Sequence, residues 1–183
     1  METPRMVLRP FTESDVDLLV ELNTDADVMR FLGPPMSRAD TEAEFPKYLT
    51  DVFLAAFAKD TGEFLGWFEF RPLADGAAEL GYRLRSGAWG RGFATEGSRA
   101  LIDRGFRTGT QRVVAETMFV NSGSRRVMEK CGLRHVRTFH VDWPDPLPGT
   151  EHGEVAYELT RDEWLAQHRG QGTGDAPSRG AGI

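Results

Sequence analysis

The sequence feature that most constrains the fold is a glycine-rich turn between an extended segment and an amphipathic one, centred on Gly90 and Gly92. Glycines in such a turn let backbone amides approach a bulky anion without interference from a Cβ atom. The first turn of the following helix adds unpaired N–H groups and the positive end of the helix dipole. Arg83, Arg85 and Arg91 add local positive charge. The pattern therefore indicates a strand–turn–helix unit that binds a phosphate or a pyrophosphate.

Two familiar phosphate-binding loops do not fit this segment. The Walker loop requires a Gly-Lys-Ser/Thr ending, which is absent. The dinucleotide-binding loop requires a small residue three places after its second glycine, where this chain has Thr95. Glycine pairs also occur in turns that bind nothing. The turn alone therefore leaves two interpretations open, an anion site and an ordinary strand-to-helix connection.

Hydrophobic periodicity and turn residues predict one mixed α/β domain. The chain has 183 residues, 40% of them hydrophobic, which suits one core and would make two cores cramped. We expect strands at residues 7–11, 52–58, 63–71, 77–85, 112–120, 134–143 and 154–160. We expect helices at residues 12–23, 26–32, 40–49, 92–108, 122–131 and 162–168. The domain is predicted to span residues 1–168, and the Gly-, Ser- and Pro-rich tail at 169–183 is predicted to be disordered.

Composition limits which binding partners and which cell compartment are expected for this protein. The net charge of -6 and the pI of about 5.3 argue against nucleic acid as the main partner, because phosphate backbones bind clustered Lys and Arg. The single cysteine, Cys131, excludes an intramolecular disulfide and a cysteine-built metal site, and we expect it in the core. No segment resembles a signal peptide or is apolar enough to cross a bilayer. These observations predict a cytoplasmic protein with no membrane partner.

A second strand–helix unit, at residues 120–133, contains the pattern Asn-x-x-Ser and ends in Glu-Lys-Cys-Gly. Together with Trp-Gly-Arg-Gly-Phe-Ala-Thr-Glu at residues 89–96, it resembles the GNAT superfamily of N-acetyltransferases, specifically the RimJ/RimL-type branch. Leu8-Arg9-Pro10 and the segment at residues 159–164 are also similar to that branch. The resemblance covers residues 5–168. It implies the GNAT fold, a central and mostly antiparallel sheet that is splayed at its centre and has helices on both faces.

The resemblance also implies acetyl-CoA as co-substrate and assigns parts of this chain to it. The pyrophosphate would lie on the amides of the turn, the pantetheine arm would extend the splayed sheet like an added strand, and the second helix would contact the thiol end. The residues so implied are Leu84 and Arg85 for pantetheine, Gly90, Arg91, Gly92, Phe93, Ala94 and Thr95 for the pyrophosphate, and Asn121 and Ser124 for the thiol end. Trp89 stands where the wider superfamily has Arg or Gln, which leaves the backbone site intact.

Direct acetyl transfer requires a group that accepts the proton of the amine. Glu79 and Glu69, on the two strands expected at the centre, are the candidates, and each needs a raised pKa to serve well. An exposed or salt-bridged glutamate is the alternative for both. An α-amine has a pKa of about 7.8 and a lysine of about 10.4, a difference of about 3.5 kcal/mol in deprotonation. Without an obvious strong base, the predicted acceptor is a protein N-terminal α-amine or a small-molecule amine of similar pKa.

The departing thiolate needs a proton or a hydrogen-bond donor. Many enzymes of the resembled superfamily have Tyr four residues before the last glycine of the second motif, but this chain has Met128 there. Ser124 is the candidate substitute, with helix capping as its alternative role. A thiol pKa of about 8.5 makes a strong acid less necessary. The missing tyrosine leaves open a second function, a catalytically idle CoA-binding sensor, and the turn alone leaves open a partner-binding domain.

The proline-rich segment at residues 140–152 is the last feature with chemical content. In the resembled fold this region borders the acceptor site, so its Trp143 would form an apolar wall. Its acidic residues, which would attract a cationic amine, are Asp142, Asp145, Glu151 and nearby Glu154. An ordinary solvated loop is the alternative. His140 and His152 lack a recognised ligand spacing, so we expect no metal. The sequence is compatible with a monomer and with a homodimer.

Overall fold

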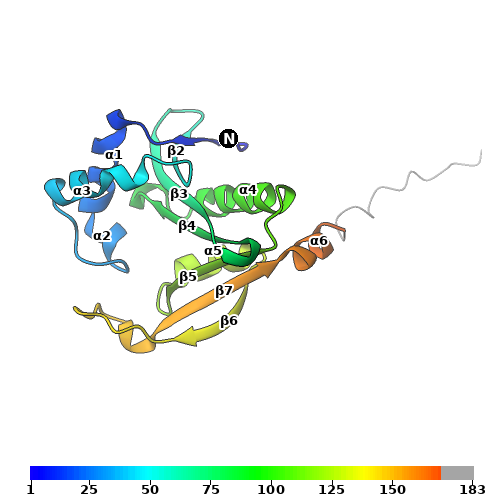
Figure 1. Cartoon of the computed structure of the whole chain (residues 1–183). Helices are drawn as coiled ribbons and strands as arrows, with labels where there is room; N and C mark the ends of the chain where they lie inside the picture. The colour runs from blue at the N-terminus through cyan, green and yellow to red at the C-terminus, as the bar shows by residue number, and fades with distance from the viewer. Residues whose placement is uncertain (170–183) are drawn as a thin grey trace, which may run out of the picture.

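A computed structural model describes residues 1–169 of the chain. Its strands form one seven-stranded sheet of order β1-β2-β3-β4-β5-β7-β6 (Figure 1). The strands are β1 (Met6–Pro10), β2 (Phe53–Ala58), β3 (Phe64–Pro72), β4 (Ala77–Leu84), β5 (Arg112–Met118), β6 (Arg134–Phe139) and β7 (Glu154–Thr160). Neighbouring strands are antiparallel except β4 and β5, which are parallel.

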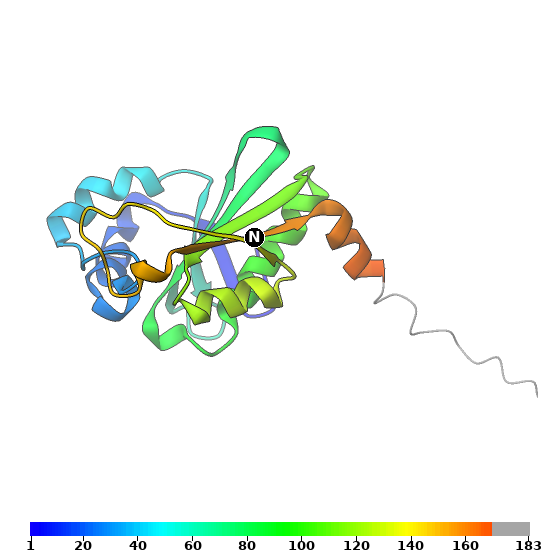
Figure 2. The ribbon, with the colours of Figure 1, turned by 90° about the horizontal axis from the view of Figure 1, so that it is seen from below.

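Helices lie on both faces of this sheet (Figure 1, Figure 2). They are α1 (Val16–Thr24), α2 (Ala26–Met29), α3 (Arg38–Glu44), α4 (Phe93–Arg107), α5 (Ser122–Lys130) and α6 (Arg161–Arg169). Short 3-10 turns occupy Glu13–Asp15, Phe45–Tyr48, Ala74–Gly76, Ser86–Ala88 and Thr150–His152. Helix α1 packs on β3, whereas α4 packs on β3 and β4 and α5 on β5. Among the described helices, none combines the length and the apolar character needed to span a membrane.

Alternation along β3 divides its side chains between the two helical layers. Trp67 joins the buried cluster beneath α1, whereas Phe68 and Phe70 point at α4 on the other face. Helix α4 has glycines where these rings approach. A Cβ atom added at Gly97 would lie 2.3 Å from the Phe68 ring, and one at Gly105 would lie 2.4 Å from the Phe70 ring. The two glycines therefore let α4 lie close against the sheet.

The sheet separates at its centre. Strands β4 and β5 pair only from Ala77↔Arg112 to Glu79↔Val114, although both strands continue beyond that point. From there on β4 pairs with β3 alone, so its other edge has no strand neighbour. This opening divides the sheet into a β1–β4 half and a β5–β7–β6 half. The mostly antiparallel sheet with helices on both faces confirms the predicted fold class.

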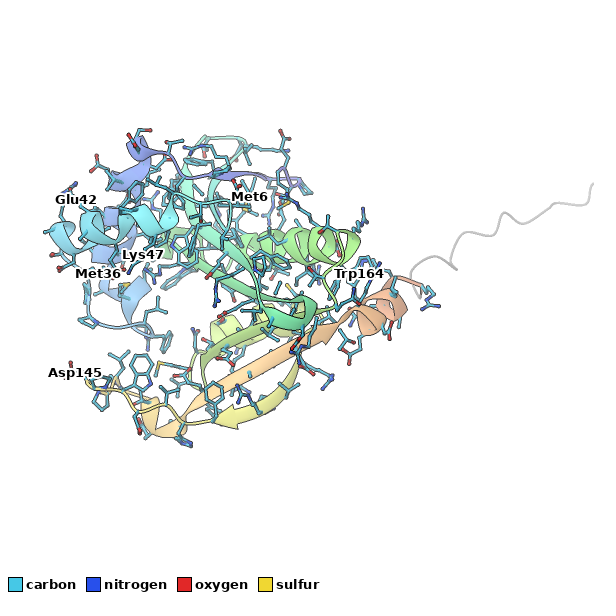
Figure 3. All side chains as sticks on the ribbon, in the orientation of Figure 1. Met6, Met36, Glu42, Lys47, Asp145 and Trp164 are labelled. Atoms are coloured by element: carbon cyan, nitrogen blue, oxygen red, sulfur yellow. The ribbon has the colours of Figure 1, made fainter. Side chains whose placement is uncertain are left out.

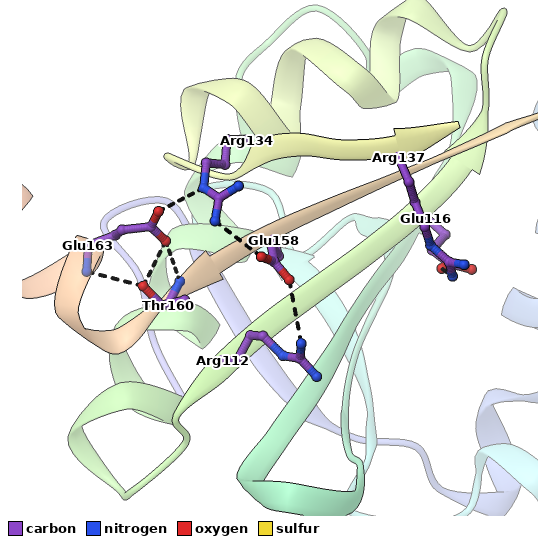
Figure 4. Close-up of polar contacts among 7 residues, drawn as sticks. All are labelled: Arg112, Glu116, Arg134, Arg137, Glu158, Thr160 and Glu163. Carbon is purple, nitrogen blue, oxygen red and sulfur yellow. Dashed lines mark hydrogen bonds and ion pairs between the residues drawn. The ribbon is translucent and has the colours of Figure 1, made fainter. Parts of the chain in front are cut away.

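The β5–β7–β6 half has a polar face held by ion pairs (Figure 4). Glu158 on β7 lies between Arg134 at 3.2 Å and Arg112 at 3.6 Å. Arg134 also contacts Glu163 of α6 at 2.7 Å. Hydrogen bonds from the backbone of Thr160, together with Arg134, lower the pKa of Glu163 to about 2. Exposed pairs of this kind add little stability singly, but here they fix the start of α6 against the sheet.

Several predicted elements are shorter in the structure. The helix expected at residues 26–32 is α2, which ends at Met29, and the strand expected at residues 112–120 is β5, which ends at Met118. The strand expected at residues 134–143 ends at Phe139, because Phe139 pairs with Glu154, the first residue of β7, and the residues before that form a 3-10 turn and not a strand partner. The helix expected at residues 40–49 is α3 followed by a 3-10 turn. Pro46 stands at the start of that turn and has no amide to continue the α-helical ladder.

The C-terminal boundary also differs by one residue from the prediction. Helix α6 extends to Arg169, which the prediction assigned to the tail. The other residues of that tail, 170–183, lie outside the described residues. The disorder of the tail therefore stays a prediction.

Candidate active site

The turn between β4 and α4 exposes a row of unpaired backbone donors. Gly90 and Gly92 have φ values of 71° and 86°, a left-handed conformation that other residues adopt only with strain. The first bond of the helical ladder runs from the amide of Glu96 to the carbonyl of Gly92, at 3.0 Å. Among the described residues, no acceptor receives a hydrogen bond from the amides of 90–95. Together with the dipole of the 15-residue helix α4, these amides form an anion site.

The N-terminal segment holds this turn in place. Arg5 donates to the carbonyl of Arg91 at 2.9 Å and forms an ion pair with Glu96 at 2.7 Å. Glu96 also accepts hydrogen bonds from Thr3, at 2.6 Å, and from the amide of Arg5, at 2.8 Å. Burial by itself raises the pKa of Glu96, but these hydrogen bonds outweigh it and the net pKa is lowered. The charged carboxylate is thus fixed at the first turn of α4.

A hollow of about 470 Å³ adjoins the same turn. Its lining residues are Pro4, Arg5, Gly92, Thr95, Glu96, Arg99 and Lys130. Arg99 is fixed there because its guanidinium donates to the backbone carbonyl of Lys130. Three lining side chains are cationic in a protein whose net charge is -6, so this hollow extends the positive environment of the turn.

The free edge of β4 shows which backbone groups can pair with an added strand. The amide of Arg85 donates to Leu65 at 2.9 Å, and its carbonyl accepts from Ala88 at 2.9 Å. Because bonded pairs alternate along an antiparallel ladder, Leu84 and Tyr82 face the opening instead. The carbonyl of Leu84 accepts the Trp89 indole N–H at 2.8 Å.

The prediction that a pantetheine arm pairs with the backbone of Arg85 therefore conflicts with the structure. Both backbone groups of Arg85 are already bonded within the protein, and the carbonyl of Leu84 is bonded to Trp89. The backbone of Tyr82 lies past the last β4–β5 pair, where β4 has no neighbour on that side. Tyr82 and the amide of Leu84, rather than Arg85, are therefore the backbone groups at which β4 can pair with an added strand.

On the other side of the opening, α5 brings Ser124 to the site. Asn121 is its N-cap, accepting from the amide of Ser124 at 3.2 Å and donating to Thr117 at 3.0 Å, so its amide group has a structural role. The hydroxyl of Ser124 lies 3.0 Å from the hydroxyl of Tyr82, across the opening. Burial raises the pKa of Tyr82, so this phenol stays protonated and remains a hydrogen-bond donor. Met128, which replaces the expected tyrosine, is buried in the core.

Sequence reasoning did not identify Tyr82 as a site residue. The available signal was its alternation with Glu79 and Arg83, which places it on the face of β4 opposite to theirs. That face is covered by α4 and α5, so Tyr82 was indistinguishable from a core aromatic residue until the position of α5 was known.

The two candidate bases lie together on the face of β3 and β4 that carries α1, opposite to the face covered by α4 and α5. In the register of these strands, Glu69 lies opposite Gly81 and Arg71 lies opposite Glu79. Arg71 donates to Glu69 at 3.0 Å and forms an ion pair with Glu79. Burial raises the pKa of Glu69, and Glu79 adds to this effect, while Arg71 opposes it.

Gly81 makes room for the Glu69 carboxylate. A Cβ atom added at Gly81 would lie 3.1 Å from the Glu69 carboxylate oxygen. Glu69 therefore lies over β4 two residues past the last β4–β5 pair, whereas Glu79 lies in that last pair. Of the two, Glu69 is the one beside the opening.

The loop after β6 lies at the same end of the molecule as the segment after α2, as Asp145 and Met36 show in Figure 3. A hollow of about 580 Å³ in this loop is lined by Val141, Asp142, Trp143, Pro146, Leu147, Pro148, Thr150 and Glu151. Glu154, at the start of β7, is only 8% exposed. Burial raises its pKa, and one of its carboxylate oxygens has no partner among the described residues. The described residues contain no group of three or more His, Cys, Asp or Glu able to hold a metal ion.

Comparison with known proteins decides the family. The family model described as an acetyltransferase (GNAT) domain matches residues 5–134. This chain belongs to the GNAT acetyltransferase family. The FsC-acetyl coenzyme A-N(2)-transacetylase of Aspergillus fumigatus is 33% identical to it over 190 residues, which cover 92% of this chain and 79% of the relative.

Solved structures agree in fold with this GNAT protein. A GNAT-family acetyltransferase from Bacillus anthracis has a TM-score of 0.77 at 23% identity, covering 88% of this chain and 98% of that one. The ribosomal alpha-N-protein acetyltransferase RimL in complex with coenzyme A has a TM-score of 0.72 at 21% identity, covering 88% and 97%. The protein is an acetyl-CoA-dependent N-acyltransferase, which confirms the predicted enzyme class and co-substrate.

Proposed function

We propose that this enzyme acetylates an α-amine, of a protein N-terminus or of a small molecule, by direct attack on acetyl-CoA in a ternary complex. The observation that supports this most is the row of unpaired amides at residues 90–95 beside the opening between β4 and β5. We further propose that it belongs to the RimJ/RimL-type branch, which its motifs and its similarity to the RimL structure support. The cytoplasmic location is part of the proposal and rests on composition alone.

The unpaired backbone groups of the site indicate where each part of acetyl-CoA binds. The amides of 90–95 bind the pyrophosphate of acetyl-CoA, and the backbone of Tyr82 pairs with its pantetheine arm. This orientation puts the thioester in the opening, next to the hydroxyl groups of Tyr82 and Ser124. Asn121 acts indirectly, by capping α5 and so positioning Ser124.

Glu69 is the proposed base. The amine attacks the thioester carbonyl, its proton passes to the Glu69 carboxylate directly or through water, a C–N bond forms and the C–S bond breaks. The departing thiolate accepts a hydrogen bond from the hydroxyl pair of Tyr82 and Ser124. Glu79 is the alternative base, and we rank it second because its side chain is more exposed and it lies within the last β4–β5 pair.

A base whose carboxylate pKa is raised suits an α-amine better than a lysine. An α-amine, with a pKa of about 7.8, is partly neutral at physiological pH, whereas a lysine ammonium must first lose a far more tightly held proton. The names of two similar proteins, an N(2)-transacetylase and an alpha-N-protein acetyltransferase, support the same class of acceptor.

Two measurements test the proposal. Calorimetry with CoA measures binding, and thiol release from acetyl-CoA is then compared among N-terminal peptides, lysine peptides with blocked N-termini, and small amines. We expect release with free α-amines. A clear preference for lysine peptides would contradict the proposed acceptor. CoA binding without thiol release from any amine would instead favour the idle sensor.

A further inference from the structure

Arg83 of β4 has a partly buried charge with no partner of opposite sign. Its terminal Nη1 donates to the side-chain oxygen of Asn23, at the end of α1. Its guanidinium lies over the ring of Trp67, 5.3 Å from the ring centre. Both contacts are neutral. Among the described residues, no carboxylate oxygen lies within ion-pair distance of Arg83, and its Nε is buried without a hydrogen-bond partner.

The neighbouring arginines on the same face, unlike Arg83, form ion pairs with carboxylates. Arg85, two residues further along β4, forms ion pairs with Glu21 and Glu63. Arg71, on β3, pairs with two glutamates. Burial lowers the pKa of Arg83, because removing its charge from water has a cost that the nearby Tyr48 and Glu44 offset only in part. An isolated, desolvated guanidinium is a ready site for an anion from outside.

Arg83 lies on the face of the sheet from which the acceptor amine approaches the thioester. Helices α4 and α5 cover one face of the opening between β4 and β5, so an amine has to approach the thioester from the other face. Gly81 and Arg83 lie on that other face, with the Glu69 carboxylate beside Gly81. The Arg83 Cα lies about 7 Å along the strand from Gly81, within reach of groups attached near the reacting amine.

We infer that Arg83 binds a carboxylate of the acceptor, so that the preferred substrates are amines that have an anionic carboxylate close to the reacting nitrogen. One N–H of Nη1 and both of Nη2 remain unbonded within the described residues and match the two oxygens of a carboxylate. Asn23 and the Trp67 ring hold the guanidinium plane in position. This inference rests on the proposed function and specifies its substrate class.

Matched amines that differ in one carboxylate test the inference. One pair is alanyl-aspartate and alanyl-asparagine, and the other is alanyl-glutamate and alanyl-glutamine, all with amidated C-termini. Thiol release at saturating acetyl-CoA gives kcat/KM for each amine. In at least one pair we expect the wild-type enzyme to prefer the carboxylate by at least about tenfold, the effect of one charged hydrogen-bonded contact.

Three variants assign the preference to Arg83. In Arg83→Gln the preference falls toward one, and Arg83→Lys, which keeps the charge without the planar fork, retains part of it. Arg38→Gln is the matched control, because it removes an arginine of α3 that is already paired with Asp17 and Glu42. The control keeps the wild-type preference, and CoA affinity stays unchanged in all three variants.

Two results would overturn the inference while acetyl transfer itself stands. They are equal use of both members of both pairs by the wild type, and a preference that Arg83→Gln leaves intact. A binding measurement separates this failure from failure of the proposed function. Calorimetric titration of the CoA-loaded enzyme with amidated N-acetyl-alanyl-aspartate, compared with its asparagine analogue, tests the carboxylate preference without catalysis, and equal binding of the two contradicts it.

Discussion

At the scale of single residues, the two candidate bases share one ion-pair partner, Arg71. Arg71 contacts both candidate bases, so each glutamate is partly neutralised. Glu69 is the more buried of the two, with a side chain 16% exposed against 32% for Glu79. The pKa of Glu69 is raised although Arg71 opposes the shift, so burial is the stronger effect. A carboxylate in this state accepts a proton more readily near neutral pH.

Glu69→Gln is expected to lower kcat/KM by about 100-fold or more, because it removes the proton acceptor. The wild-type activity should fall as the pH drops through the raised pKa of Glu69, and this limb of the pH profile should vanish in the variant. Glu79→Gln is the comparison, with a smaller expected loss. The reverse order of losses would assign the base to Glu79.

The same substitution has a separate expected effect on stability. Because the pKa of Glu69 is higher in the folded state, the folded protein binds its proton more tightly than the unfolded chain does, and this favourable contribution is lost as the pH rises through the folded pKa. Glutamine avoids that loss. Thermal unfolding at pH 7 should therefore show a Tm for Glu69→Gln that is no lower than that of the wild type, and a large decrease would indicate a structural role instead.

Tyr82→Phe tests the hydroxyl pair in the opening. We expect kcat to fall by about tenfold or more, since a hydrogen bond to a charged thiolate is lost, while the Kd for CoA changes little. Tyr157→Phe is the matched control, because it removes a buried hydroxyl that bonds Arg125 and Glu129 instead. Equal losses in the two variants would exclude a specific role for Tyr82.

At the scale of elements, α4 connects the cofactor turn to the core. Its first turn presents free amides, and its middle packs on β3 through Gly97, whose position leaves room for the Phe68 ring. Phe68 is fully buried, so the ring can shift only by displacing its neighbours in the core. The helix is thereby held at a fixed depth on the sheet, and its N-terminus at a fixed distance from the end of β4.

Gly97→Ala is expected to destabilise the protein by about 1–3 kcal/mol through overpacking against Phe68. This exceeds the gain in helix propensity of about 1 kcal/mol, because the contact of 2.3 Å is with a ring that can move away only by displacing its neighbours. Thermal unfolding measures the change in Tm. Gly87→Ala is the control, since nothing lies within 4 Å of a Cβ atom there. A similar Tm in both variants would contradict the packing argument.

At the scale of the whole molecule, the cofactor site lies between two halves of one sheet. The halves meet in the short β4–β5 pairing and through the helices that cross it, and the unpaired edge of β4 faces the opening. A ligand that bonds both the turn and this edge should tie the two halves together and stabilise the folded state, by about 2.7 kcal/mol at a concentration of 100 times its Kd.

Hydrogen exchange can locate this stabilisation. CoA is expected to slow amide exchange at residues 90–95 and at Tyr82, and to leave β1 and β2 unchanged. Adenosine 3′,5′-bisphosphate and pantetheine, tested separately, do not span the site and so protect less than CoA. Unchanged exchange in residues 90–95 at saturating CoA would exclude the turn as the pyrophosphate site.

The sequence by itself determined the features that depend on local chemistry. Periodicity predicted the α/β class and most element positions, since side-chain spacing follows directly from helix and strand geometry. Gly90 and Gly92 marked the turn, because their left-handed conformations suit glycine. The glutamates on the central strands were candidates on residue type alone.

Only the tertiary structure decided the features that depend on strand register and on distant elements. Register placed Glu69 over Gly81, and the Leu65–Arg85 bond removed Arg85 from the free edge. The packing of α5 placed the Ser124 hydroxyl beside that of Tyr82. The packing of α1 gave Arg83 the neutral Asn23 as its partner in place of a carboxylate. The physical reason is that pairing, burial and charge compensation arise between residues far apart in the chain, and no local pattern specifies which of them meet.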